Sequence, residues 1–118
     1  MTRIMMIGLM LLPLTTAAWA SNPPASDEEK DLATNLMISC LVQRSAELDD
    51  GISDVNSIGM AVMANCDHEI RTLAETKARG MKNSPRMFER IYEYMREDNT
   101  SAIQAILMHR KDERLPKQ

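Results

Sequence analysis

Aromatic residues are scarce in this chain of 118 residues, which contains one Trp, two Tyr and one Phe. Glycine is also rare, with four in the whole chain, and no Gly-rich loop of the kind that cradles a phosphate occurs. The chain is net acidic and has no cluster of basic and aromatic residues. These absences argue against nucleotides and nucleic acid as partners.

Catalytic signatures are missing as well. Asp67-His68-Glu69 begins like the zinc-binding helix of a metalloprotease, but position 72 is Thr where a second His is required. His68 lies roughly 200° around a helix from Cys66, so it cannot serve as the base for a thiol nucleophile. His109 is expected near the C-terminus of the last helix, where the helix dipole favours an imidazolium. We therefore expect that the protein is not an enzyme and has no cofactor.

Two clusters resemble metal-ligand sets without predicting a metal site. Soft ligands suited to Cu(I) recur in one segment, but they spread over about 200° of a helical wheel. Three acids surround Gly51, but they lack the alternating ligands of an EF-hand loop. We interpret these acids as a solvated loop that caps the next helix, and as a candidate partner-binding surface. The soft ligands are Met60, Met63, Cys66 and His68, and the acids are Asp49, Asp50 and Asp54.

No apolar run reaches the roughly 20 residues that span a membrane. The longest, residues 4–14, follows Arg3 and precedes Ala18-Trp19-Ala20. This order predicts a signal peptide over residues 1–20 with cleavage after Ala20, and an amphipathic N-terminal core helix is the alternative. Cleavage leaves one domain of 98 residues, which we expect in the periplasm and not inserted in the membrane.

Helical patterns dominate the mature chain. After a short leader at 21–25, expected to be extended or flexible, "SDEE" predicts a capping box between Ser26 and Glu29. Apolar residues then recur at helical spacing and predict a helix over 27–48 whose stripe faces the core. The stripe comprises Leu32, Ala33, Leu36, Met37, Cys40 and Leu41.

A second helix is predicted over 54–79. Gly51 suits the left-handed turn after the first helix, and Ser53 or Asp54 suits the next N-cap. One narrow apolar stripe runs along the whole segment, which ends at Gly80. It comprises Val55, Gly59, Val62, Cys66, Ile70 and Leu73.

The last segment begins with Ser84 as the expected N-cap and Pro85 at the first helical position. Its apolar residues keep their phase from Phe88 to Ile106, with Phe88, Tyr92 and Met95 as expected core anchors. Asp98-Asn99-Thr100 is also a good cap, so one helix over 85–112 and two shorter helices both remain open.

No period-two strand pattern occurs. The sequence predicts an all-α bundle of three to four helices over 26–112, with a tail at 113–118.

Cys40 and Cys66, the two cysteines of the chain, lie at equal distances from Ser53. Residues equidistant from the turn of an antiparallel hairpin lie side by side, so the symmetry predicts a disulfide that staples two helices. Such a bond is expected in an exported protein and stabilises by roughly 3 to 4 kcal/mol. Two buried free thiols are the alternative.

Charge is divided between the two halves of the mature chain. Residues 21–69 contain ten acids and two bases, whereas residues 70–118 contain seven acids and eleven bases. Either the halves pack against each other, or the surface is polarised and steers a partner. Tyr94 falls about 60° outside the apolar arc of its helix, so it is a candidate partner-binding residue or an edge residue of the core.

The layout resembles small bacterial periplasmic helical proteins with one cross-helix cysteine pair. It is similar in architecture to the immunity proteins that protect against type VI secreted cell-wall amidases, and this resemblance implies a binding role. The first hypothesis is therefore an inhibitor, immunity or accessory factor that binds another periplasmic protein, with a homodimer left open. The alternatives are a stress-type periplasmic chaperone, with its methionine-rich surface, and a carrier of a metal or small molecule.

Overall fold

The computed structural model describes residues 23–114, and these residues form helices without strands. The all-α prediction is confirmed. Residues 21–22 and the predicted signal peptide lie outside the described part. The helices are α1 (Asp27–Leu48), α2 (Val55–Asn65), α3 (Asp67–Ala78), α4 (Ser84–Glu97) and α5 (Thr100–Arg114).

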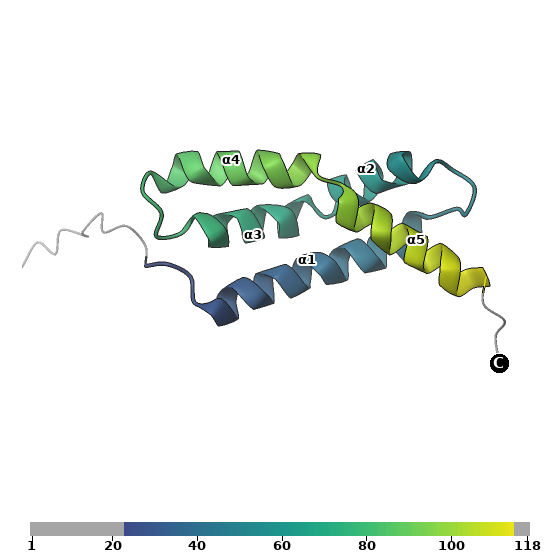
Figure 1. The fold of residues 1–118 in the computed structure, drawn as a ribbon, viewed down its shortest axis with the longest axis horizontal. Helices are drawn as coiled ribbons and strands as arrows, with labels where there is room; N and C mark the ends of the chain where they lie inside the picture. Colours follow the sequence, from purple (N-terminus) through teal and green to yellow (C-terminus); the bar gives the residue numbers. More distant parts are fainter. Residues whose placement is uncertain (1–22, 115–118) are drawn as a thin grey trace, which may run out of the picture.

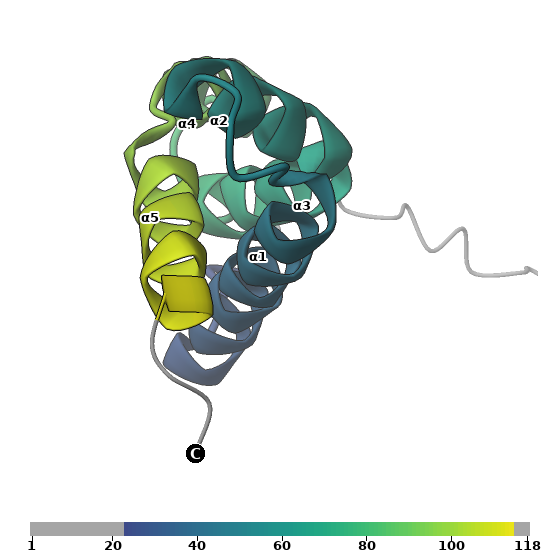
Figure 2. The same ribbon diagram turned by 90° about the vertical axis from the view of Figure 1, so that its right-hand side faces the viewer.

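The helices form a bundle with a different arrangement at each end. α3 lies between α1 and α4 at one end, whereas α5 crosses α1 and α2 at the other (Figure 1). The end-on view shows α1 at the lower edge of the bundle, with α5 beside it (Figure 2). α1 contacts α2, α3 and α5, while α4 packs mainly against α3.

The predicted helical hairpin and its staple are confirmed. The sulfurs of Cys40 and Cys66 lie at bonding distance, with 5.9 Å between the two Cα atoms. Gly51 takes the left-handed conformation after α1, at φ +76°, and Asp54 caps α2 by accepting from the amide of Ser57. The turn chemistry therefore sets the register that brings the cysteines together.

The single helix predicted over 54–79 is wrong, because the chain breaks at Cys66 into α2 and α3. Cys66 has φ −100° and ψ 16°, and its amide is shared between the carbonyls of Val62 and Met63. Asp67 and Glu69 in the first turn of α3 favour a helix start there. The apolar stripe survives the break, since Val62, Cys66 and Ile70 are all buried.

The last segment is two helices, so the alternative left open by the sequence is settled. Asp98 accepts hydrogen bonds from the amide and hydroxyl of Thr100 where α5 begins. α5 continues to Arg114, two residues beyond the boundary expected at 112. Ser84 is not the N-cap of α4. Asn83 takes that position at φ 55°, and the Ser84 hydroxyl donates to the carbonyl of Ala78 at the end of α3.

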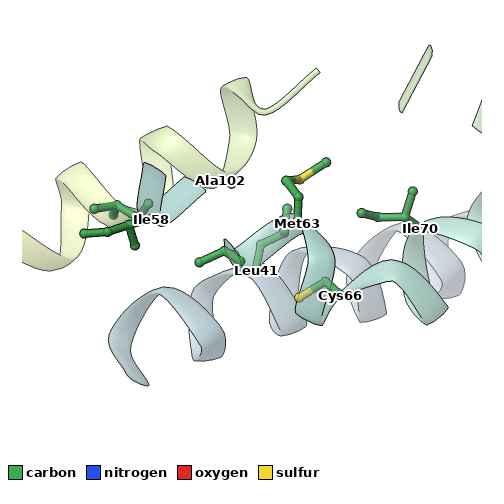
Figure 3. Close-up of a cluster of buried hydrophobic side chains, with 8 residues drawn as sticks. Leu41, Ile58, Met63, Cys66, Ile70 and Ala102 are labelled. Atoms are coloured by element: carbon green, nitrogen blue, oxygen red, sulfur yellow. The ribbon is translucent and has the colours of Figure 1, made fainter. Parts of the chain in front are cut away.

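The core lies where α1, α2, α3 and α5 meet. Figure 3 shows Leu41 of α1 and Ile58 of α2 in this cluster, with Cys66 and Ile70 toward α3. No residue of α4 is buried, but Tyr92 and Met95 are half-buried and pack against this cluster, and the half-buried Phe88 stacks on Tyr92. The cause is that α4 has one main neighbour, so its apolar face is covered from one side.

The leader is packed at its end, which corrects the expectation of a flexible segment for the residues described. Ala25 is buried, and Pro24 lies against Gly80, where an added Cβ would approach the Pro24 backbone to 2.8 Å. Ser26 accepts from the Glu29 amide as predicted. The Glu29 carboxylate does not complete the capping box, because it pairs with Arg79 at the end of α3.

Candidate functional site

The side of α1 that faces away from the bundle is uncharged and partly apolar. Residues 32–43 contain no Asp, Glu, Lys or Arg. Seven of them are exposed, and we call this set the α1 outer face. It comprises Leu32, Asn35, Leu36, Ile38, Ser39, Val42 and Gln43. The four large apolar members leave between 47 and 61 % of their surface exposed.

This finding corrects the predicted core stripe of the first helix. Ala33 and Leu41 are buried and Met37 is half-buried, but Leu32 and Leu36 face solvent. Apolar residues lie all round the middle of α1, so periodicity alone does not select the buried side. The signal in the sequence is the absence of charge from twelve consecutive residues of a helix on the surface of the bundle.

α4 provides an internal comparison. Its exposed positions are charged, with Pro85 and Tyr94 as the exceptions. That is the usual surface of an amphipathic helix. Because α1 lacks such a charged surface over three turns, its outer face is chemically distinct from the other long surface helix.

Tyr94 is 70 % exposed, as its place on the helical wheel suggested. Its neighbours one turn away are Arg90 of α4 and Asp98 at the C-cap of α4, and both are exposed. Tyr94 is therefore an isolated aromatic in a charged surface. Its role in partner binding stays a prediction.

Asp49 belongs to a latch between the hairpin turn and α5. Arg110 donates from Nε and Nη2 to the Asp49 carboxylate at 3.0 to 3.2 Å, and its Nη2 also donates to the carbonyl of Ser53. His109 Nδ1 lies 3.2 Å from Oδ2 of the same carboxylate, which also accepts from Arg110 Nε. The Gly51 amide also donates to Asp49. This geometry joins the acidic front half of the chain to its basic back half.

The latch leaves Asp49 no free surface for a partner. Its side chain is 1 % exposed, and that of Arg110 is 16 % exposed. The hydrogen bonds from Arg110 lower the pKa of Asp49 from 3.8 to about 2, with smaller contributions from Gly51 and His109. The carboxylate is thus held in its charged form by its partners and serves the fold.

The other two acids of the turn serve local structure. Asp50 accepts from the Ser53 hydroxyl and from the amides of Ser53 and Ile52, which lowers its pKa to about 2. Asp54 is the N-cap of α2. The three acids adjoin one another as predicted, but each has its oxygens directed to the chain itself.

A groove of about 690 Å³ lies between the end of α2 and the end of α4. Met60 and Met63 line one side, and Tyr92 and Arg96 line the other. The Tyr92 hydroxyl donates to Asp67, and the guanidinium of Arg71 lies 4.8 Å from the centre of the Tyr92 ring. The groove is therefore lined by methionine side chains and by an aromatic ring that a hydrogen bond to Asp67 holds in place.

Potential metal ligands converge at one place among residues 23–114. The sulfurs of Cys40 and Cys66 and a carboxylate oxygen of Glu69 lie within 4.8 Å of one another. Both sulfurs are joined in the disulfide, so neither is a thiolate ligand. Of the soft ligands singled out in the sequence, Cys66 is held in the disulfide, Met60 is exposed and Met63 is buried in the core.

Within the described residues, every helix is too short or too polar to cross a bilayer. Comparisons with protein-family models, with curated proteins and with solved structures found no match for this chain.

Proposed function

We propose that this chain is an exported, non-catalytic protein of the periplasm that acts by binding another protein. The α1 outer face is the observation that carries the proposal. The middle of α1 carries large apolar residues on its outer side as well as on the side that packs against the bundle, and those on the outer side are exposed. Burying one leucine fully stabilises a complex by roughly 1.5 to 3 kcal/mol, so a partner that covers this face gains substantially.

Three further features support an exported binding protein. The N-terminal sequence has the order of a signal peptide, and a disulfide bond is typical of an oxidising compartment. The carboxylates with lowered pKa values accept hydrogen bonds from neighbouring residues of the chain, in the latch, in the hairpin turn, at the start of α5 and beside Arg44 on α1. The layout is similar to that of helical immunity proteins, which implies an inhibitor, immunity or accessory role.

Export is tested by measuring the intact mass of the protein from a periplasmic extract. We expect a chain that begins at Ser21 and carries no free thiol. A mass that retains residues 1–20 would contradict the signal peptide.

Binding is tested by affinity capture from periplasmic extract with the oxidised mature protein, beside its Leu36→Glu variant. A captured protein is identified by mass spectrometry, purified, and titrated against both forms by calorimetry. We expect stoichiometric binding to the wild type and at least a tenfold loss for Leu36→Glu, because the introduced carboxylate must be desolvated.

The matched control is Leu107→Glu, which places the same charge at a leucine of α5 that is as exposed as Leu36. It should bind like the wild type. Equal loss in both variants, or none in either, would show that the α1 outer face is not the contact surface.

A stress-type chaperone is the second candidate. The exposed methionines Met60 and Met108 favour it, because flexible thioether side chains suit varied partners. The two functions differ in their response to acid or heat. A chaperone should bind an apolar dye more strongly and hold unfolded clients, whereas a specific binder should keep its dye signal unchanged until it unfolds.

A further inference from the structure

We propose that Cys40, Cys66 and Glu69 bind one zinc ion when the disulfide is reduced, so that the ion replaces the covalent staple of the hairpin. The two sulfurs and a carboxylate oxygen of Glu69 already lie within 4.8 Å of one another in the oxidised chain. Oxidation returns the pair to the disulfide and releases the ion. The inference does not rest on the proposed function, because it concerns the reduced chain and needs no protein partner.

Two of the ligands lie together at the start of α3. Cys66 is the N-cap residue of this helix, and Glu69 lies three positions later in its first turn. Residues three apart on a helix lie on the same face. The side chain of Cys66 makes no capping hydrogen bond in the oxidised chain. As a thiolate, the Cys66 sulfur carries a negative charge at this position, and the dipole of the helix stabilises that charge.

The third ligand comes from α1. The hairpin brings Cys40 opposite Cys66, with 5.9 Å between the two Cα atoms. In a tetrahedral zinc site each Zn–S bond is about 2.3 Å long, so two sulfur ligands lie roughly 3.8 Å apart. Rotation about the two Cα–Cβ bonds gives this separation while the helices stay in place. The backbone of the hairpin therefore suits two thiolate ligands as well as the disulfide.

The carboxylate of Glu69 is available as a ligand. Glu69 is half-buried, and no ion pair among residues 23–114 includes it. Asp67 in the same turn of α3 differs, because it accepts from the Tyr92 hydroxyl and pairs with Arg71. After reduction, two thiolates and the Glu69 carboxylate form a group of three negative charges, which a divalent cation compensates.

The chemistry of the ligand set selects zinc. Mg²⁺ and Ca²⁺ take oxygen ligands, so two thiolates disfavour them, and Cu(I) prefers thiolates and thioethers to a carboxylate. Thiolates and carboxylates are both ordinary ligands of Zn²⁺, and three protein ligands leave the fourth position to water. Cys66 is fully buried whereas Cys40 and Glu69 are half-buried, so the ion enters from the side of the latter two.

Reduction and zinc binding are separate steps. A dithiol reductant transfers two electrons and two protons to the disulfide, which gives two protein thiols and the disulfide of the reductant. Zinc binding then releases the two thiol protons to solvent, because the metal binds thiolates. In the reverse direction a disulfide reagent takes two electrons from the cysteine pair and becomes a dithiol. Zn²⁺ leaves with its oxidation state unchanged.

The test uses mature protein that is reduced with dithiothreitol and freed of the reductant by gel filtration without oxygen. Titration with Co²⁺ reports the ligands, since a thiolate-to-cobalt charge-transfer band indicates sulfur and the visible bands indicate tetrahedral geometry. Zn²⁺ should then displace Co²⁺, with one ion for each chain. The oxidised protein should show neither the charge-transfer band nor zinc binding at this site.

Variants assign the ligands. Glu69→Gln keeps the size of the side chain and should weaken zinc binding by at least about tenfold. The matched control is Glu75→Gln, at an exposed position of the same helix, which should bind zinc like the wild type. Reduced wild-type protein that takes up no Zn²⁺ would overturn the site. So would binding that Glu69→Gln leaves unchanged, or that Glu75→Gln weakens equally.

Melting gives a readout that does not require the reduced chain to stay folded. The three ligands converge only in the folded chain, so Zn²⁺ should raise the melting temperature of the reduced protein, or restore its helical circular dichroism if reduction unfolds it. The oxidised protein should melt at the same temperature with and without Zn²⁺. No effect of Zn²⁺ on the reduced protein would overturn the inference. The proposed function is judged by partner capture with the oxidised protein, so the two fail separately.

Discussion

Removing the charge of Asp49 tests whether the latch between the hairpin turn and α5 holds the fold together. Asp49→Asn keeps the shape of the side chain and an acceptor for the Gly51 amide. It replaces the carboxylate whose oxygens accept hydrogen bonds from the Arg110 guanidinium nitrogens at 3.0 to 3.2 Å. The lost contact spans 61 positions of sequence, so it acts on the docking of α5 rather than on a single helix.

The magnitude follows from the pKa of Asp49, which falls from 3.8 to about 2 on folding because of the Arg110 hydrogen bonds. One pKa unit corresponds to about 1.4 kcal/mol. Since Arg110 is partly exposed and solvent screens the pair, we expect Asp49→Asn to lower the free energy of unfolding by about 1 to 2 kcal/mol at pH 7.

The stabilisation by Asp49 depends on pH, and this dependence distinguishes the loss of its charge from other effects of the substitution. The folded-state pKa is lowered, so the stabilisation is complete well above pH 4 and disappears as the pH falls toward 2. Urea unfolding, followed by circular dichroism at pH 7 and pH 2.5, gives the free energy of unfolding of the wild type and of Asp49→Asn. The difference between wild type and Asp49→Asn should shrink to about a third at pH 2.5.

The control is Asp112→Asn, which removes the same charge from an exposed position of α5. It should change stability by less than about 0.5 kcal/mol. Two results would refute the reasoning. One is a loss for Asp49→Asn no larger than that for Asp112→Asn, and the other is an equal loss at both pH values.

Three further predictions concern the disulfide and the aromatic residues. The double variant Cys40→Ser/Cys66→Ser should lose about 3 to 4 kcal/mol in urea unfolding, because it opens a loop with a sequence separation of 26; no change on reduction would contradict the staple. Tyr92→Ala should lower the unfolding free energy by about 1 to 3 kcal/mol, less than for a fully buried aromatic, since Tyr92 is half-buried. Tyr94→Ala should leave thermal melting nearly unchanged, and if it also weakens binding of a captured partner, α4 contributes to the contact surface.

The fold was predictable where local chemistry decides it. Ser26, Gly51 and Asp54 determine helix ends through hydrogen bonds and backbone conformation within a few residues, and such features are visible in a sequence. The pairing of Cys40 with Cys66 could be predicted because the two residues lie at equal distances from this turn. The break at Cys66 was hidden because the apolar stripe continues across it, although Asp67 and Glu69 marked a helix start.

The candidate surface was less predictable, because it depends on which side of each helix its neighbours cover. Leu32 and Leu36 have the same spacing from Cys40 as core residues would, and tertiary packing alone decides that they face solvent. The apolar residues of α4 are only half-buried for the same reason, because α4 packs mainly against α3. Asp49 was recognised as a member of an acidic cluster, but its partner Arg110 is distant in sequence and no local pattern indicates the pair.

The disulfide also changes what a cut in the backbone would do. Its bond closes a ring around the turn between α1 and α2, and that turn contains Ile52, which is 91 % exposed. A protease that cleaves there opens the ring without releasing a fragment, because Cys40 and Cys66 still hold the two pieces together. The peptide bonds beside Ile52 are therefore ones whose loss leaves the molecule in one covalent piece, and a nicked chain would separate only under reducing conditions.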